Sequence, residues 1–180
     1  DLRRTSAQHR RLSGPRRVLM TLPVDLARQT LEACRGRSQM VATAESCTGG
    51  LIGATLTEIA GSSDVVDRGF ITYSNNAKIE MLGVTPKALD THGAVSEQVA
   101  AQMAQGALDR SNAQITVSVT GIAGPGGSDF KPEGRVCFGL AQDGYATATQ
   151  TVEFGPLGRA NVREATVETA LTWLQERLKR

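Results

Sequence analysis

Two short apolar segments that run directly into glycine-rich turns constrain the fold of this chain more than any other feature. Residues 40–44 are followed by the polar turn 45–50 and then by a helical pattern of apolar residues over 51–59. Residues 115–119 are likewise followed by 120–127, a segment with four glycines. Buried strands that lead through such turns into helices are typical of α/β domains with a largely parallel sheet. The sequence therefore predicts an α/β fold.

The remaining periodic segments extend this order of helices and strands. We expect helices over residues 23–34, 74–82, 96–108 and 159–178, and strands over residues 69–73, 135–142 and 146–154. Asp143-Gly144 lies between the last two strands, and this dipeptide is typical of a two-residue hairpin turn. We predict a three-layer α/β/α sandwich around a mixed, mainly parallel sheet of about five strands, with a C-terminal antiparallel hairpin.

The first residues differ in composition from the rest of the chain. Six of the 20 lysines and arginines lie in residues 1–19, which contain no aromatic residue. We expect a disordered Arg-rich arm over residues 1–22 and one domain over residues 23–180. Residues 1–19 are expected to be dispensable, with Met20 as a natural start. A transit peptide has a similar composition. Beyond residue 19 the chain holds 14 basic and 17 acidic residues, so specific nucleic-acid binding is not expected.

Hydropathy, cysteines and histidines exclude several other classes of protein. No segment reaches the roughly 18 consecutive apolar residues of a membrane helix, so we expect no membrane association. Cys34, Cys47 and Cys137 are odd in number and widely spaced, which argues against disulfides and structural zinc and favours a cytoplasmic location. The chain has two histidines, too few for a histidine-based metal site or a Ser-His-Asp triad. We expect neither a metal nor a cofactor.

Ser46 is the first candidate for chemistry. In open α/β sheets ligands bind beyond the carboxyl ends of the strands, where loops 45–50, 73–78 and 120–127 are expected. A serine at a strand-to-helix junction can expose its hydroxyl while the following amides stabilise an oxyanion. The alternative is structural, because Ser46 or Thr48 could simply cap the helix.

A serine nucleophile needs a base, and the second loop supplies candidates for that role. Lys78, Tyr73 and Glu45 are the residues that could accept the proton in the absence of a usable histidine. Lysine could do so near neutral pH if burial lowered its pKa by about 3 units from roughly 10.4. The alternatives are a solvated lysine and a tyrosine at the edge of the core.

The third loop and the last helix suggest an anion site. Glycines in residues 120–127 let backbone amides approach an anion closely, although a plain structural turn would have the same composition. Arg159 and Arg163 are four residues apart on one helix face and could reach the same phosphate, or could both be solvated.

Taken together, these segments resemble one family. Residues 44–50 (AESCTGG), 73–78 (YSNNAK), 82–84 (LGV), 93–97 (GAVSE), 120–127 (TGIAGPGG) and 131–134 (KPEG) resemble the CinA C-terminal domain family, over about residues 24–178. Some members also carry a molybdopterin-binding-like domain, and we expect this chain to be the stand-alone form.

The resemblance implies a function and a set of site residues. It implies an α/β/α amidohydrolase that converts nicotinamide mononucleotide to nicotinate mononucleotide and ammonia, with Ser46 as nucleophile and Tyr73 and Lys78 as its activating partners. The oxyanion would then be stabilised by amides around residues 48–50. The substrate-binding residues expected are Glu45, Thr48, Gly49, Gly50, Asn76, Thr120, Gly121, Gly124, Gly126, Gly127, Arg159 and Arg163.

Two other functions use the same pocket. One is a nucleotide-sensing or partner-binding module without turnover, suggested by the competence and DNA-damage label of the family. The other is another amidase, or a cysteine hydrolase that uses Cys47. The expected partner is a small-molecule nucleotide substrate, the sensing or partner-binding module would add a stoichiometric partner, and a homo-oligomer is compatible with the sequence.

Overall fold

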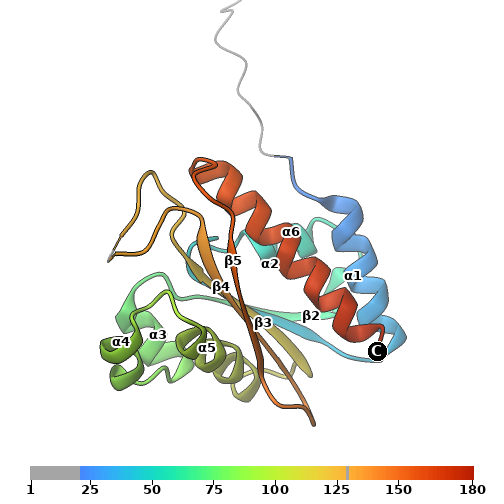
Figure 1. The fold of residues 1–180 in the computed structure, drawn as a ribbon. Coiled ribbons are helices and arrows are strands. Elements are labelled where there is room, and N and C mark those ends of the chain that lie inside the picture. Colours follow the sequence, from blue (N-terminus) through green and yellow to red (C-terminus); the bar gives the residue numbers. More distant parts are fainter. Residues whose placement is uncertain (1–20, 129) are drawn as a thin grey trace, which may run out of the picture.

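The computed structural model describes residues 21–128 and 130–180 (Figure 1). Most of the predicted arm lies outside the described residues. The helices are α1 (Val24–Gly36), α2 (Leu51–Thr57), α3 (Asn75–Leu82), α4 (Pro86–His92), α5 (Glu97–Asp109) and α6 (Arg159–Leu178), with one 3-10 turn, η1 (Ser62–Asp64). The strands are β1 (Val41–Glu45), β2 (Val66–Ile71), β3 (Ile115–Gly121), β4 (Arg135–Gln142) and β5 (Ala148–Glu153).

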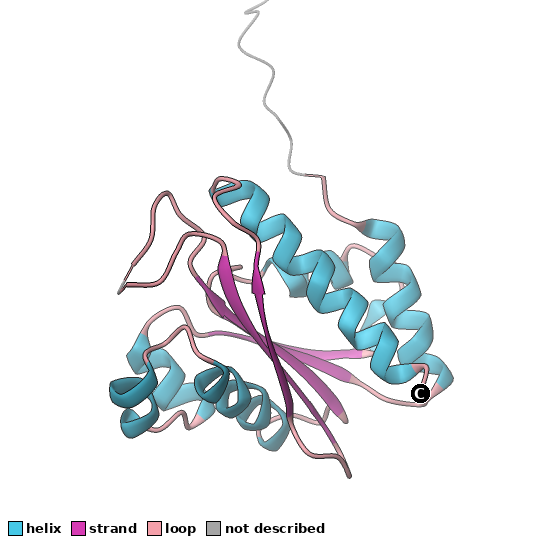
Figure 2. Cartoon of the chain, viewed as in Figure 1, coloured by secondary structure: helices cyan, strands magenta, loops and turns pink. Residues whose placement is uncertain are grey.

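The five strands form one mixed sheet in the order β2-β1-β3-β4-β5 (Figure 2). β1 pairs in parallel with both β2 and β3, whereas β4 pairs antiparallel with β3 and with β5. Four strands therefore run in one direction and β4 alone runs in the other. The predicted α/β fold, with its mixed sheet and C-terminal hairpin, is confirmed.

Helices cover both faces of the sheet (Figure 1). α1, α2 and α6 pack on one face over a large apolar core to which β3 contributes Ile115, Val117 and Val119. α3, α4 and α5 pack on the other face over a smaller cluster that includes Met103. Because β1 is central and covered on both faces, all five of its residues are buried. This explains why the segment reads as a continuous apolar run rather than an alternating one.

α5 lies unusually close to the sheet and to α3. The hydroxyls of Thr116 and Ser118 on β3 donate hydrogen bonds to the α5 carbonyls of Ala104 (2.7 Å) and Ala100 (2.6 Å). Gly106 of α5 faces the Leu82 carbonyl so closely that a Cβ would overlap it. These contacts fix α5 along the sheet and, through α3, the position of the second loop.

The sequence predicted most helix boundaries but missed one element. α6 has the predicted bounds, and α3 begins after the Ser74 cap and ends at Gly83 as expected. α4 was not predicted, although Thr85 caps it and a proline occupies its first turn, which are typical start signals. β2 lies earlier than predicted, and β5 begins at Ala148 because the turn after β4 is longer than two residues.

Candidate active site

The turn that follows β1 places Ser46 at the carboxyl edge of the sheet. We call residues 46–50 the nucleophile turn. The Ser46 amide donates to the Val119 carbonyl of β3 (3.0 Å), and the Gly49 amide donates back to the Ser46 carbonyl (3.0 Å). Gly49 and Gly50 have φ values of 58° and 101°, a region that glycine adopts without strain. The chain can therefore turn sharply from β1 into α2.

Lys78 reaches Ser46 from the first turn of α3. Its Nζ donates to Ser46 Oγ (2.9 Å), to the Thr72 carbonyl (2.8 Å) and to the Tyr73 carbonyl (3.3 Å). The helix that carries it is capped by Ser74, whose Oγ accepts a hydrogen bond from the Ala77 amide (3.0 Å). The two loops therefore meet through a direct contact between a serine hydroxyl and a lysine amine.

The Lys78 side chain is almost fully buried, with 1% of its surface exposed. Burial lowers its pKa from 10.5 to about 8, because removing an ammonium group from water disfavours the charged form. Within the described residues it forms no ion pair with a carboxylate. A substantial fraction of a lysine with this pKa is neutral near pH 7 to 8, and a neutral amine can accept a proton from a hydroxyl.

Tyr73 and Arg159 form the exposed side of the site. Arg159 donates from Nη2 to the Tyr73 hydroxyl (3.0 Å) and from Nη1 to the Gly124 carbonyl (2.8 Å). The Tyr73 hydroxyl is thus directed to Arg159, and Tyr73 contacts Lys78 through its carbonyl. Among the hydrogen bonds of the described residues, none joins the Tyr73 hydroxyl to Ser46 or Lys78.

Glu45 lies behind the nucleophile turn. Its buried carboxylate accepts hydrogen bonds from the hydroxyls of Thr43 (3.2 Å) and Thr48 (2.6 Å) and from the amides of Ile52 (2.9 Å) and Gly53 (3.0 Å). The last two amides belong to the first turn of α2, where donors have no partner within the helix. The carboxylate therefore caps α2.

Arg163 lies behind the turn as well. Its Nη2 donates to the Thr48 carbonyl (3.1 Å), and its Nε is buried without a hydrogen-bond partner. Arg159 lines the pocket beside Ser46, whereas Arg163 does not. These two arginines thus have different contacts, whereas their spacing was compatible with one shared phosphate or with two solvated side chains.

Ser46 opens into a pocket of about 220 Å³. Six of the predicted site residues line it, namely Ser46, Tyr73, Lys78, Thr120, Gly121 and Arg159. The other predicted residues lie outside this lining: Glu45, Thr48, Gly49, Gly50, Asn76, Gly124, Gly126, Gly127 and Arg163. Sequence reasoning missed the lining residues Asn75, Ala94, Val95, Ile122, Ala123 and Ser128, and Cys47, the alternative nucleophile, lines the pocket as well. For all of the missed residues except Ser128, a position in the matching segments was the available signal.

Three side chains hold residues 120–127, which we call the glycine loop, and the segment that follows them. The Glu133 carboxylate accepts a hydrogen bond from the Gly126 amide (2.8 Å), and Arg159 holds the Gly124 carbonyl. Lys131 donates from Nζ to the carbonyls of His92 (2.9 Å) and Val95 (2.5 Å), which joins the loop to the segment between α4 and α5. This segment supplies the opposite wall of the pocket, so the pocket is shaped by contacts between loops.

Further features limit the chemistry of the described residues. No three His, Cys, Asp or Glu side chains gather there in an arrangement that could hold a metal ion. In the same part of the chain, every helix is too short or too polar to cross a membrane. The groups available for chemistry at this site are therefore a serine hydroxyl and a lysine amine, beside a polar pocket.

Comparison with known proteins shows the family to which this chain belongs. The sequence model of the CinA C-terminal domain family matches residues 24–178, so the chain belongs to this family. Two solved structures have the same fold. One is the competence/damage inducible protein CihA from Agrobacterium tumefaciens (52% identity, TM-score 0.82, covering 87% of this chain and 94% of that chain). The other is competence damage-inducible protein A from Klebsiella pneumoniae (36% identity, TM-score 0.83, covering 87% and 96%).

Curated relatives differ in length. A protein of Enterobacter agglomerans named nicotinamide-nucleotide amidohydrolase PncC is 48% identical over 148 residues, which are 82% of this chain and 90% of that protein. A CinA-like protein of Chlorobaculum tepidum is 46% identical over 168 residues, which are 90% of this chain and 39% of that protein. The chain thus spans less than half the length of this CinA-like relative.

Proposed function

We propose that this protein hydrolyses the carboxamide of nicotinamide mononucleotide to nicotinate mononucleotide and ammonia, as a step in pyridine-nucleotide salvage. The observation that carries the proposal is the 2.9 Å contact between Ser46 Oγ and the buried Nζ of Lys78. Support also comes from the relative named nicotinamide-nucleotide amidohydrolase, which the match covers over 90% of its length.

Lys78 acts as the base in the proposed mechanism. A neutral amine has two N–H groups and one lone pair, and the carbonyls of Thr72 and Tyr73 can hold the two N–H groups. The lone pair then faces the Ser46 hydroxyl and takes its proton as Oγ bonds to the carboxamide carbon. The resulting ammonium finds three acceptors in the same positions, so the charge forms without rearrangement.

Backbone amides of the nucleophile turn stabilise the oxyanion. The Gly49 amide is engaged by the Ser46 carbonyl, whereas those of Cys47 and Thr48 have no partner among the hydrogen bonds of the described residues. We assign these two amides to the oxyanion. When the tetrahedral intermediate collapses, the C–N bond breaks and Lys78 returns the proton to the departing ammonia. Water then hydrolyses the acyl-enzyme and releases the carboxylate.

The substrate phosphate has a partner on the exposed side of the pocket. Arg159 lines the pocket and forms no ion pair within the part of the chain that the structure describes. It stands at the start of α6, where unpaired amides also favour an anion. We assign the phosphate to Arg159.

Ser46 is preferred to the neighbouring Cys47 as nucleophile. The Cys47 side chain packs in the apolar core, and burial raises its thiol pKa to about 12, so the reactive thiolate is not formed near neutral pH. Its position next to Ser46 nevertheless makes it the natural comparison. The three cysteines of the described residues are free thiols, which supports the further proposal of a cytoplasmic location.

The test is ammonia release by wild type, Ser46→Ala and Cys47→Ala with nicotinamide mononucleotide, nicotinamide, NAD and glutamine as substrates. We expect turnover of the mononucleotide by wild type and Cys47→Ala, and its loss in Ser46→Ala. Tight mononucleotide binding by wild type without ammonia release would contradict the proposal and favour a sensing module. Activity in Ser46→Ala together with a dead Cys47→Ala would move the nucleophile to the thiol.

A further inference from the structure

Thr48 lies between the buried carboxylate of Glu45 and the half-buried guanidinium of Arg163. Its hydroxyl donates to Glu45 Oε1 (2.6 Å), and its carbonyl accepts from Arg163 Nη2 (3.1 Å). The residue itself is completely buried. We call this chain of contacts the Glu45–Thr48–Arg163 link. It connects the end of β1 to the first turns of α6 through the middle of the nucleophile turn.

Neither charged end of the link has an ionic partner. In the described part of the chain, Glu45 and Arg163 take part in no ion pair. The carboxylate is stabilised by four hydrogen-bond donors, but within the described residues the guanidinium has one acceptor, the Thr48 carbonyl, and a buried Nε with none. Leaving a buried charged donor without a partner is unfavourable. An apolar side chain at position 163 would pack here without this desolvation penalty. We therefore infer that the hydrogen bond of Arg163 has a function beyond packing.

The link is placed to control the geometry of the oxyanion amides. Thr48 is held at its side chain by Glu45 and at its carbonyl by Arg163 and by the Leu51 amide (3.1 Å), and these three hydrogen bonds restrict tilting of the turn. The amides of Cys47 and Thr48 immediately precede that carbonyl in the chain. A guanidinium 3.8 Å from the position a Gly49 Cβ would occupy also blocks movement of the turn away from the pocket.

We propose that Glu45, Thr48 and Arg163 are positioning residues that hold the oxyanion amides in place without touching the substrate. This inference rests on the proposed function, because it uses the reaction at Ser46. It also gives Arg163 a role different from the phosphate contact predicted from the spacing of the two arginines. None of the three lines the Ser46 pocket.

The first experiment compares Thr48→Val with Thr48→Ser. Valine keeps the shape but removes the hydroxyl, whereas serine keeps the hydrogen bond to Glu45. We expect Thr48→Val to lower kcat by about 10- to 100-fold, because small displacements of oxyanion donors have effects of this size. KM should change by less than about threefold, and Thr48→Ser should restore most of kcat.

Thr55→Val is the matched control. Thr55 is a fully buried threonine of α2 whose hydroxyl donates to the Leu51 carbonyl (2.7 Å), away from the link. Its replacement should lower the melting temperature about as much as Thr48→Val but leave kcat within about twofold. Equal losses of kcat in the two valine variants would overturn the proposal, since the effect would then follow stability.

The second experiment removes the other end of the link. Arg163→Met should lower kcat as Thr48→Val does, and the double variant should lose less than the product of the two single effects. Arg177→Met, at the other end of α6, is the control, because Arg177 is also half-buried and its side chain bonds Gln142 (3.4 Å). A rise in KM with unchanged kcat in Arg163→Met would instead make Arg163 a phosphate contact and refute the proposal.

A substrate-independent readout separates this inference from the proposed function. A fluorophosphonate probe labels an activated serine by forming an O–P bond as fluoride leaves, and its oxygen occupies the oxyanion position. The rate of Ser46 labelling, followed by mass spectrometry, should fall about 10-fold or more in Thr48→Val and Arg163→Met but not in the controls. Wild type that labels at Ser46 but releases no ammonia would reject the proposed substrate alone. Equal labelling of wild type and both link variants would reject the link alone.

Discussion

The last residue of β1 and the first residue of the turn that follows it line two different cavities. Ser46 opens into the pocket of about 220 Å³, while Glu45 lies on the floor of a larger pocket of about 400 Å³ between α2 and the edge strand β2. In the larger pocket the Glu45 carboxylate is surrounded by four donors. In the smaller one the Lys78 amine contacts the Ser46 hydroxyl at 2.9 Å. The contact between an amine and a hydroxyl, and not the volume of the pocket, distinguishes the candidate site.

The largest effect is expected when the amine of the smaller pocket is removed. Lys78→Met keeps most of the side-chain volume, so turnover of nicotinamide mononucleotide should fall by about 10² to 10⁴ while the fold is kept. Steady-state ammonia release and circular dichroism test this. The control is Lys87→Met on the exposed side of α4, which should leave both unchanged. Normal turnover in Lys78→Met would show that the two pockets do not differ in the way proposed.

The pH dependence of kcat/KM should follow the protonation of the Lys78 amine. With a Lys78 pKa of about 8, kcat/KM should rise about tenfold per pH unit below that value and level off above it, because the neutral form is the base. This amounts to roughly 50-fold between pH 6 and pH 8, where half of the amine is neutral. Initial rates over pH 5.5 to 9.5, in buffers of constant ionic strength, measure the profile. A rate independent of pH across this range would exclude a lysine base.

Stability should depend on pH in the direction set by a lowered lysine pKa. Between about 8 and 10.5 the unfolded lysine still binds a proton that the folded one has lost. The free energy of unfolding therefore rises with pH across this window, by roughly 3 kcal/mol relative to Lys78→Met. Urea unfolding of both proteins at pH 7 and at pH 10 isolates the contribution. A difference between the two proteins that is independent of pH would contradict the burial argument.

A smaller effect is expected at the exposed rim of the smaller pocket. Tyr73→Phe removes the hydroxyl that accepts from Arg159 but keeps the carbonyl that holds Lys78. We expect KM to rise by about 2- to 10-fold with little change in kcat, the size of one neutral hydrogen bond. Tyr145→Phe is the control, because Tyr145 is equally exposed, at 62%, and lies outside the pocket. A loss of kcat comparable to that of Lys78→Met would indicate that the tyrosine hydroxyl takes part in the proton transfer.

The smallest effect is expected in the larger pocket. A Cβ at Gly53 of α2 would meet neighbours at ordinary contact distances, with Glu45 Oε2 nearest at 3.6 Å. Gly53→Ala should therefore raise the free energy of unfolding by about 0.5 to 1 kcal/mol and leave turnover unchanged. Gly106→Ala, whose Cβ would overlap the Leu82 carbonyl, should destabilise the protein instead. A loss of turnover in Gly53→Ala would give the larger pocket a part in the reaction.

Local signals in the sequence predicted the strands, the turns and most helices. Glycines at 49 and 50 indicated the sharp turn after β1, and Ser74 indicated the start of α3. The direct contact between Ser46 and Lys78, 32 residues apart, follows from the pairing of β1 with β2, which no local pattern encodes. The fall of the Lys78 pKa to about 8 likewise depends on burial by several elements.

The two arginines of α6 show where pattern reasoning stops. Residues 159 and 163 share a helix face, and their spacing alone allowed one shared phosphate or two solvated side chains. The glycine loop meets this face at Arg159, and the nucleophile turn meets it at Arg163. The two guanidinium groups therefore bond different carbonyls, those of Gly124 and Thr48. Spacing on a helix indicates which side chains are neighbours but not which loop each of them meets.

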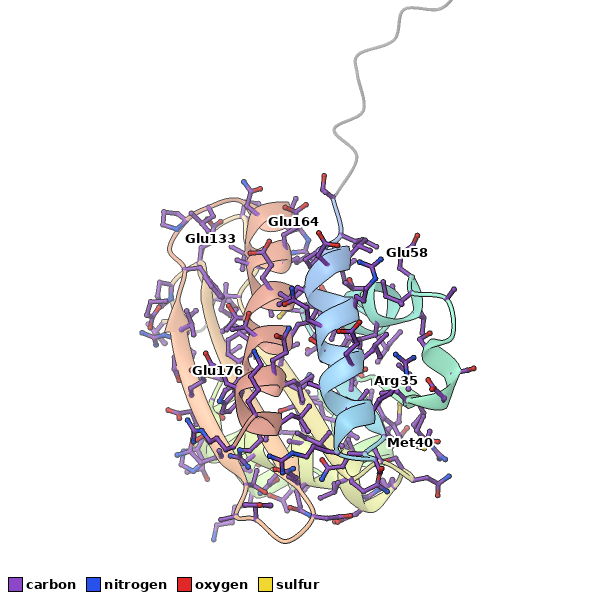
Figure 3. The ribbon with its side chains drawn as sticks, turned by 90° about the vertical axis from the view of Figure 1, so that its right-hand side faces the viewer. Arg35, Met40, Glu58, Glu133, Glu164 and Glu176 are labelled. Carbon is purple, nitrogen blue, oxygen red and sulfur yellow. The ribbon has the colours of Figure 1, made fainter. Side chains whose placement is uncertain are left out.

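The direction of α6 separates the molecule into a reactive end and a remote one. The helix begins beside the pocket at Arg159 and runs for 20 residues, so its last turn lies about 30 Å away. In Figure 3, Glu164 and Glu176 mark the two halves of this helix along its outer surface. The turn at Asp143 after β4 also lies at the remote end, because β4 alone runs against the other strands. Fluorescent dyes, surface tethers or fused reporters attached there would leave the reacting groups in their native surroundings.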